Sequence, residues 1–308
     1  MLLAMIEGVK FMEIPEVNDL FDKRITNITP IRRNGVREVY KATYNGCPVI
    51  LKKVENSEWA KIEFNNLKKA SDLLKPHGLK VPRAIEVRES WILLEFIPGK
   101  KNALSFKELQ KALEYLHVLH SSDYSTIPHL YSHYYGENLI NRLNEEKEYL
   151  HKAIKQYPRF SSFKNDFEKV LEIAINHKLN DSPVIGHGDF QAKNIIVNES
   201  EIVPLDWRDF GELLRWYDVG NLLFKSELKW DELLRLVKHY LQVGSKQSNI
   251  SSKEIEKNVK EALSITFIIR TGSHFRHLLD TNEDSPEDYK KVETNIQYIK
   301  KILRPSIS

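Results

Sequence analysis

Two Asn-Gly dipeptides near the N-terminus constrain the fold of this chain more than any other feature of its sequence. Asn34-Gly35 and Asn45-Gly46 separate the short runs ITNITPIRR, VREVYKATY and CPVILKKV, which are rich in β-branched and aromatic residues. Asn-Gly between such runs is the strongest short-range signal for a β-hairpin. Residues 26–54 are therefore predicted to form strands joined by tight turns.

The hydrophobic period changes from residue 57 onward. Apolar residues recur there at helical spacing, namely Trp59, Ile62, Leu67, Ala70 and Leu74. This pattern predicts a helix that stops before Pro76. Two further strands are expected around LKVPRAIEV and SWILLEFI, before Pro98-Gly99.

The remainder of the chain is mainly helical in pattern. Apolar residues at a spacing of 3.6 predict helices near 104–120, 137–158, 163–178, 212–225, 230–243, 253–278 and 286–303. One β-hairpin interrupts them, with strands at 195–198 and 202–206. We therefore expect an α+β protein with a β-rich N-terminal nucleotide-binding lobe (1–97), a larger helical catalytic and substrate-binding lobe (98–308), and a cleft between them.

Composition excludes several classes of protein. The net charge is +3, and the basic residues are spread along the 308-residue chain, so no nucleic-acid partner is expected. The single cysteine, Cys47, rules out an internal disulfide and fits a reducing compartment. No run reaches the roughly 20 apolar residues of a membrane span, and the N-terminus lacks the pattern of a signal peptide. A cytoplasmic protein without a membrane partner is expected.

The chemistry is concentrated in the segment VIGHGDFQAKNIIV, residues 184–197. His187-Gly188-Asp189 is followed five positions later by Asn194, and the hairpin then leads to Asp206. Phosphoryl transfer from ATP needs a carboxylate that accepts the proton of the attacking hydroxyl. It also needs oxygen ligands for Mg²⁺, which a carboxamide and a second carboxylate supply.

Asp206 and Asp209 compete for the role of metal ligand, because Asp209 begins a literal Asp-Phe-Gly. If the hairpin turns within 198–201, Asp206 falls beside Asn194. Asp209 lies three residues further on, up to about 10 Å away in an extended chain. Asp206 is therefore the predicted metal ligand, whereas Asp209 could face the substrate or cap a helix starting near Glu212.

These motifs resemble the aminoglycoside phosphotransferase and choline kinase family, small-molecule kinases related to protein kinases. The resemblance is strongest from Val184 to Leu223 and rests on His-Gly-Asp, Asn194 and the Asp206-Trp207 pair. It implies a bilobal, protein-kinase-like fold, Asp189 as base, and Mg²⁺ on Asn194 and Asp206. It further implies structural roles for His187 and Asp218.

The same resemblance points to a nucleotide site in the N-terminal lobe. Val49-Ile50-Leu51-Lys52 matches the Val-Ala-Ile-Lys pattern, so Lys52 is expected on the phosphates, oriented by Glu63 or, failing that, Glu58. The sparse loop Asn34, Gly35 and Val36 would cover the phosphates. An apolar bed for adenine is expected from Val39, Ile50, Ile196 and Leu205, with hinge hydrogen bonds from the backbone of Glu95, Phe96 and Ile97. Recognition of the base by backbone leaves no side-chain signature in the sequence. ATP is the expected nucleotide, and GTP is not excluded.

The acceptor is expected to be a small hydroxylated molecule, such as an aminoglycoside-like antibiotic, an amino alcohol or a sugar. Asp209 and Glu212 could form an acidic rim, whereas Arg208, Arg215 and Arg270 add positive charge. The alternative is a catalytically silent binding or structural protein of the spore-coat type. Such relatives often lose the base or a metal ligand, and both are retained here. A monomer or weak dimer is expected.

Overall fold

The structure is a computed structural model that describes residues 14–34, 37–100, 103–125, 127, 131–177, 182–199, 201–224, 226–243, 250–281 and 286–303. The chain packs into two units. The first consists of Met1–Lys100 and Ile196–Arg208, and the second of Lys101–Ile195 and Asp209–Ser308. The expected boundary at 97/98 stays a prediction, but the segment 196–208 packs with the N-terminal unit instead of the C-terminal one.

The first unit is built on a five-stranded antiparallel sheet in the order β1-β2-β3-β5-β4. The strands are β1 (Ile25–Asn34), β2 (Arg37–Tyr44), β3 (Cys47–Lys53), β4 (Ala84–Arg88) and β5 (Trp91–Glu95). The turn between β2 and β3 is the predicted Asn-Gly turn, with positive φ at both Asn45 (51°) and Gly46 (82°).

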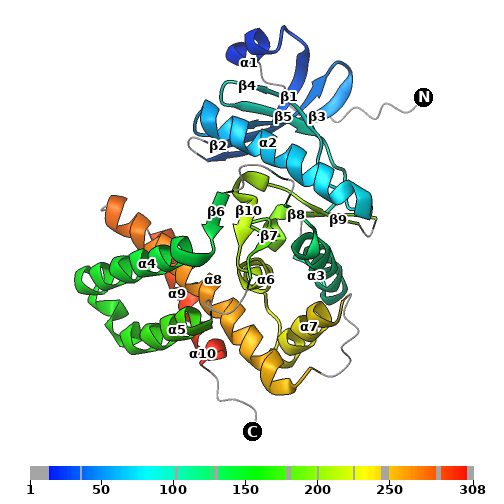
Figure 1. Ribbon diagram of the computed structural model, residues 1–308. Helices are drawn as coiled ribbons and strands as arrows, with labels where there is room; N and C mark the ends of the chain where they lie inside the picture. The colour runs from blue at the N-terminus through cyan, green and yellow to red at the C-terminus, as the bar shows by residue number, and fades with distance from the viewer. Residues whose placement is uncertain are drawn as a thin grey trace. The chain divides into compact units, whose positions relative to one another are not determined.

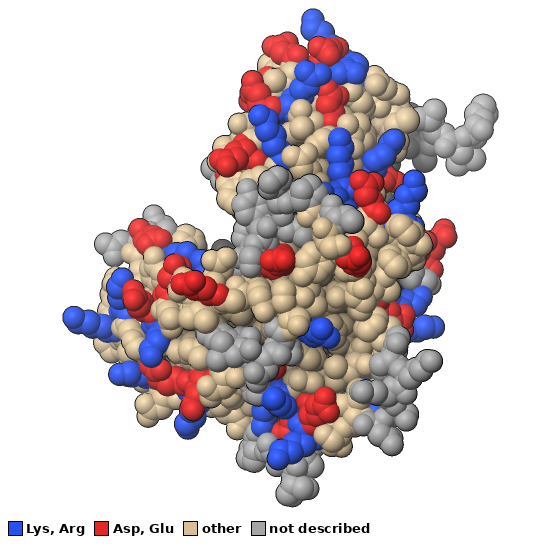
Figure 2. Space-filling model, in the orientation of Figure 1, with Lys and Arg blue, Asp and Glu red and all other residues tan. Residues whose placement is uncertain are grey.

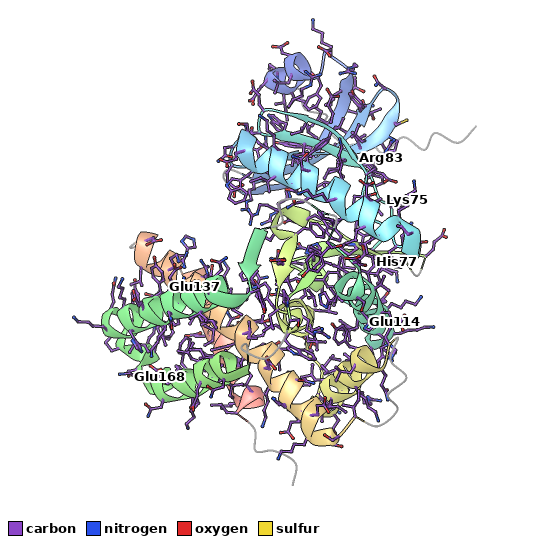
Figure 3. All side chains as sticks on the ribbon, in the orientation of Figure 1. Lys75, His77, Arg83, Glu114, Glu137 and Glu168 are labelled. Atoms are coloured by element: carbon purple, nitrogen blue, oxygen red, sulfur yellow. The ribbon has the colours of Figure 1, made fainter. Side chains whose placement is uncertain are left out.

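Strand alternation divides the sheet into two faces. On one face, Tyr40, Leu51 and Leu93 are paired across β2, β3 and β5 and pack in a core with α1 (Pro15–Leu20). On the other face, Ile92 packs beneath α2 (Ser57–Leu74), which lies across the sheet in Figure 1. Helix α2 begins at the Asn56 cap, whose side chain accepts from the Trp59 amide at 2.9 Å. It is followed by the 3-10 turn Lys75–His77 (Figure 3).

The predicted hairpin within the helical half of the sequence is confirmed as a two-stranded sheet of β8 (Ile195–Asn198) and β9 (Glu201–Pro204). Lys100 and Val197 exchange backbone hydrogen bonds of 2.9 and 3.0 Å. Gly99, at φ +148°, lies so close to β8 that a Cβ would sit 2.6 Å from the Val197 carbonyl oxygen. The Pro-Gly junction thus binds the edge of the hairpin through backbone that only glycine permits.

The second unit is mainly helical. Its helices are α3 (Phe106–Ser121), α4 (Gly136–Gln156), α5 (Lys164–His177), α6 (Arg215–Leu223), α7 (Trp230–Gln242), α8 (Ser252–Thr281), α9 (Pro286–Ile296) and α10 (Ile299–Ile302), with the 3-10 segments Pro158–Phe163 and Ala192–Asn194. The long helix α8 packs against α4, α5, α6, α7 and α9 (Figure 1). Glu114 on α3, labelled in Figure 3, lies 2.9 Å from His239 on α7.

A small sheet in this unit was not predicted. Strand β10 (Gly211–Leu213) pairs antiparallel with β7 (Val184–Gly186) and parallel with β6 (Tyr131–Tyr134). The helix expected over 212–225 therefore begins only at Arg215. The helix expected over 286–303 is divided into α9 and α10.

The predicted α+β class, with an antiparallel sheet in the N-terminal unit and helices in the C-terminal unit, is confirmed. Basic and acidic side chains are interspersed over the visible surface in Figure 2, in keeping with the small net charge of +3. Within the described ranges, no helix combines the length and apolar character that crossing a membrane requires.

Candidate active site

In the N-terminal unit, one lysine joins two carboxylates. Lys52 on β3 lies 2.6 and 2.7 Å from the two Glu63 carboxylate oxygens, and 2.9 Å from Oδ1 of Asp206. Burial alone would lower the pKa of Lys52, but Glu63 and Asp206 outweigh it and raise that pKa, so the ammonium stays charged. Glu63 is only 1% exposed, and its burial as a carboxylate requires this cation.

The position of Glu63 follows from the face of α2 on which it lies. It shares that face with the buried Leu67 and Ala70, whereas Glu58 is exposed. The contact expected between Lys52 and Glu63 is present, and Glu58 does not make it. The role of this pair toward a nucleotide stays a prediction.

Asp206 follows β9 in a left-handed conformation, with φ +66°. The turn after it is held by α2, because the side-chain amide of Asn66 donates to the Arg208 carbonyl oxygen at 2.8 Å. Trp207 is fully buried and donates its indole N–H to the Pro204 carbonyl oxygen at 3.0 Å. The Arg208 guanidinium lies 5.3 Å from the Trp59 ring centroid. Helix α2 and strand β3 together fix the Asp206 carboxylate within this unit.

The residues expected around adenine are half-buried. Val39 is paired with Lys52 across β2 and β3, and Ile50 projects from the same face of the sheet. Ile196 and Leu205 belong to the same unit through the hairpin segment. None of these positions is occupied by a charged side chain, as an apolar bed requires.

Part of the backbone expected to hydrogen-bond the nucleotide base is already bonded within the protein. The Glu95 amide N–H donates to the Arg83 carbonyl oxygen at 2.9 Å, which leaves Phe96 and Ile97 as the stronger candidates for bonding a base. Asn34 ends β1, paired with Arg37. Gly35 and Val36, expected to cover the phosphates, lie outside the described residues.

In the C-terminal unit, Asp218 on α6 fixes the His-Gly-Asp loop. Its carboxylate accepts the His187 amide N–H at 2.7 Å and the Gly188 amide N–H at 3.0 Å. His120 lies 3.5 Å away from the same carboxylate and 2.7 Å from the Tyr240 hydroxyl. Burial lowers the pKa of His120, which keeps the imidazole neutral at pH 7. The helix-to-loop connection expected of Asp218 is thus present.

The backbone geometry at Gly188 explains why the motif has a glycine at this position. Its φ is +81°, and a Cβ would meet the Asp209 carbonyl oxygen at 2.3 Å. A side chain at this position would therefore be strained by its φ and would also collide with backbone. His187 is fully buried, and its Nδ1 accepts the Asp189 amide N–H at 3.1 Å.

Three side chains converge on the Asp189 carboxylate. Gln191 and Arg270 donate to Oδ1, and the Asn194 amide donates to Oδ2 at 2.7 Å. The Asn194 amide also donates to the Asp189 carbonyl oxygen at 3.0 Å. Because both bonds use its NH₂ group, Asn194 keeps its carbonyl oxygen for another ligand.

From the sequence, Arg270 was expected only to add positive charge near the acceptor, and Gln191 was not assigned to the site. Gln191 lies two positions after Asp189, so its place in the loop offered a signal. Arg270 lies 81 residues away on α8, and nothing in the local sequence marks it. Burial would lower the pKa of Arg270, but Tyr217 and the Asp189 carboxylate outweigh it and raise that pKa.

Asp209 and Glu212 are both half-buried in the C-terminal unit. Asp209 does not cap the helix as expected, because α6 begins at Arg215 with Leu214 at its N-cap and no side-chain cap. Glu212 instead lies in β10, paired with Ile185 of β7. A substrate role for either residue stays a prediction.

A sequence model of the phosphotransferase enzyme family matches residues 27–245. The chain belongs to this family. It is a phosphotransferase of this family, which confirms the resemblance seen in the sequence. No curated protein matches the chain.

Solved structures of other kinases and phosphotransferases align over nearly the whole chain. The AMP complex of a spectinomycin phosphotransferase aligns with TM-score 0.69 and 14% identity, covering 96% of this chain and 100% of that one. An ethanolamine kinase from Plasmodium vivax aligns with TM-score 0.60 and 17% identity, covering 92% of this chain and 84% of that one. A choline kinase from Cryptosporidium parvum aligns with TM-score 0.58 and 15% identity, covering 94% of this chain and 92% of that one. These similarities show a shared kinase-like fold.

Proposed function

We propose that this phosphotransferase moves the γ-phosphoryl group of ATP to a hydroxyl of a small molecule. The observation that carries the proposal is the binding of the Lys52 ammonium to both Glu63 and Asp206. A lysine on the third strand, paired with a helix glutamate and close to the metal-binding aspartate, is the arrangement that kinases use to hold the nucleotide phosphates. The AMP in the spectinomycin phosphotransferase structure supports an adenine nucleotide.

The donor set suits a magnesium ion. Asn194 offers a carbonyl oxygen and Asp206 a carboxylate, both hard oxygen ligands. Among the described residues, no three His, Cys, Asp or Glu side chains gather into a metal cluster. Asn194 and Asp206 would each offer an oxygen to a Mg²⁺ ion that the phosphates also bind, and the ion would neutralise charge on the transferring group.

Asp189 is the proposed base. Its carboxylate accepts the proton of the acceptor hydroxyl while that oxygen bonds to the γ-phosphorus and the bond to the ADP oxygen breaks. Gln191 and Asn194 orient the carboxylate, and Asp218 holds the backbone that carries it. His187 and Asp218 act as positioning residues in this scheme.

The test is phosphoryl transfer from ATP to a panel of aminoglycosides, amino alcohols and sugars, each measured as phosphorylated product. The enzyme should modify at least one class, and Lys52→Met should lower kcat/KM at least about tenfold. Lys61→Met, at an exposed position of α2, is the control. A protein that binds ATP with Mg²⁺ yet transfers phosphate to no acceptor would instead be the catalytically silent relative.

A further inference from the structure

Arg270 on α8 is fixed on one side and open on the other. Its Nε and Nη2 donate to Oδ1 of Asn221 at 3.1 and 2.9 Å, and Nη2 also donates to Asp189. Asn221 is 2% exposed and comes from α6, so the guanidinium is anchored by a buried neighbour. Across the described part of the chain, Nη1 has no hydrogen-bond partner, and a quarter of the side chain is exposed. One edge of the guanidinium thus remains for a ligand.

The charge of Arg270 is paired with that of the proposed base. Arginine stays protonated in proteins, and Asp189 is the carboxylate with which it forms an ion pair. That ion pair uses Nη2, so the positive charge at the exposed Nη1 edge is left to attract an anion.

Other charges also act in this part of the unit. The Arg142 guanidinium lies 2.6 Å from Glu146, a carboxylate that Arg276 also contacts at 3.0 Å. Burial is the main cause that raises the pKa of Tyr134. The Asp209 carboxylate raises this pKa further and the Arg270 guanidinium lowers it, so both charges act at this tyrosine. The Tyr134 ring stacks on Tyr217, with 4.0 Å between centroids. Within the described ranges, the guanidinium of Arg270 is a cation bonded to the base.

We propose that Arg270 determines acceptor specificity, and that the acceptor carries a carboxylate or phosphate group close to the hydroxyl that is phosphorylated. The anion binds the free Nη1 edge, where a guanidinium offers planar, directional N–H donors. A cationic group in the same place is repelled by the guanidinium. The inference rests on the proposed function, because it places the acceptor beside Asp189.

The experiment compares three hexose derivatives of similar size that are anionic, neutral and cationic at pH 7: glucuronate, glucose and glucosamine. Turnover is measured with Mg²⁺-ATP, and binding to the ADP-loaded protein by calorimetry. The protein should favour glucuronate over glucosamine at least tenfold, in kcat/KM or in Kd. Arg270→Gln should abolish the preference mainly through KM, and Arg270→Lys should retain part of it. Lys257→Gln, an exposed cation on the same helix, should retain all of it.

Each other outcome is decisive. Equal treatment of the three sugars in both turnover and binding contradicts the proposal, as does a preference that survives in Arg270→Gln. If Arg270→Gln lowers kcat by the same factor for all three acceptors, Arg270 acts on the phosphoryl group in transit and the proposal is wrong. Failure of transfer to these sugars and to the wider panel of aminoglycosides and amino alcohols would overturn the proposed function, whereas binding selective for the acid and lost in Arg270→Gln would still support the role of Arg270.

Discussion

The side-chain amide of Asn66 donates a 2.8 Å hydrogen bond to the backbone carbonyl oxygen of Arg208, two residues after Asp206. Asn66 lies one turn after Glu63 on α2 and is 5% exposed. The helix that supplies the partner of Lys52 therefore also holds the turn that presents Asp206. Helix α2 and the proposed metal ligand are linked through one buried amide.

Replacing Asn66 with leucine should loosen this turn. The Arg208 carbonyl oxygen would lose its partner, at a cost of about 1–3 kcal/mol in unfolding free energy. Binding of Mg²⁺-ADP should weaken by roughly 5- to 10-fold. Calorimetric titration with ADP, with and without Mg²⁺, measures the effect, which should be largest with the metal. Asn65→Leu is the control, because Asn65 is adjacent and exposed. Equal effects of the two variants would contradict the link to Asp206.

A second prediction concerns Gly188. Gly188→Ala should destabilise the protein by more than the ~1–2 kcal/mol of a left-handed alanine, because its Cβ would also collide with the Asp209 carbonyl. Gly46→Ala separates the two effects, since Gly46 has nearly the same φ (82° against 81°) with no atom within 4 Å of an added Cβ. Chemical denaturation of both variants gives the difference. Equal losses would show that the backbone of Asp209 yields.

A third prediction concerns Asp218. Asp218→Asn would turn an NH₂ group toward one of two backbone N–H donors, so at least one charge-assisted hydrogen bond of about 1.5–3 kcal/mol is lost. Lower stability and lower kcat should appear together, with a smaller change in the KM for ATP. Asp231→Asn, at an exposed position of α7, should change neither. A variant with unchanged kcat would show that the loop keeps its form without this carboxylate.

A fourth prediction is a pH dependence of stability from Glu146 on α4. Burial raises the pKa of this carboxyl from 4.5 to about 7, although Arg142 and Arg276 oppose the shift. The folded protein therefore binds more protons than the unfolded chain between these values. The contribution of Glu146 to the free energy of unfolding is greatest below about pH 4.5. It falls by up to about 3 kcal/mol as the pH rises to about 7, and it does not change further at higher pH.

Denaturation at a series of pH values tests this slope. Glu146→Gln should remove the contribution, because glutamine does not titrate. Glu145→Gln, at a neighbouring carboxylate that is 57% exposed, should leave the slope in place. A slope that persists in Glu146→Gln would assign it to another group.

Local patterns made the N-terminal sheet, α2 and the hairpin predictable. Asn45-Gly46 marks the turn between β2 and β3 directly. The match of residues 49–52 to the Val-Ala-Ile-Lys pattern singles out Lys52, and the buried face of α2 singles out Glu63. The small sheet was missed because β10 has only three residues and depends on pairing with β6 and β7, distant in sequence. A pattern that short cannot be distinguished from the start of a helix.

The surroundings of Asp189 were predictable only in part. Asn194 follows from spacing within one loop, and Asp218 from the family resemblance. The contact of Arg270 with Asp189 depends on the packing of α8 against α6, which the amphipathic pattern does not specify. Side chains supplied by distant helices are set by tertiary packing, so local sequence carries little information about them.

The most direct test of the central claim is transfer by Asp189→Asn to whichever acceptor the unaltered protein phosphorylates, with Mg²⁺-ADP binding measured on the same samples. Loss of the base should lower kcat by about 10²–10⁴-fold, while the Kd for Mg²⁺-ADP stays within about twofold. Turnover at the rate of the unaltered protein would contradict the account.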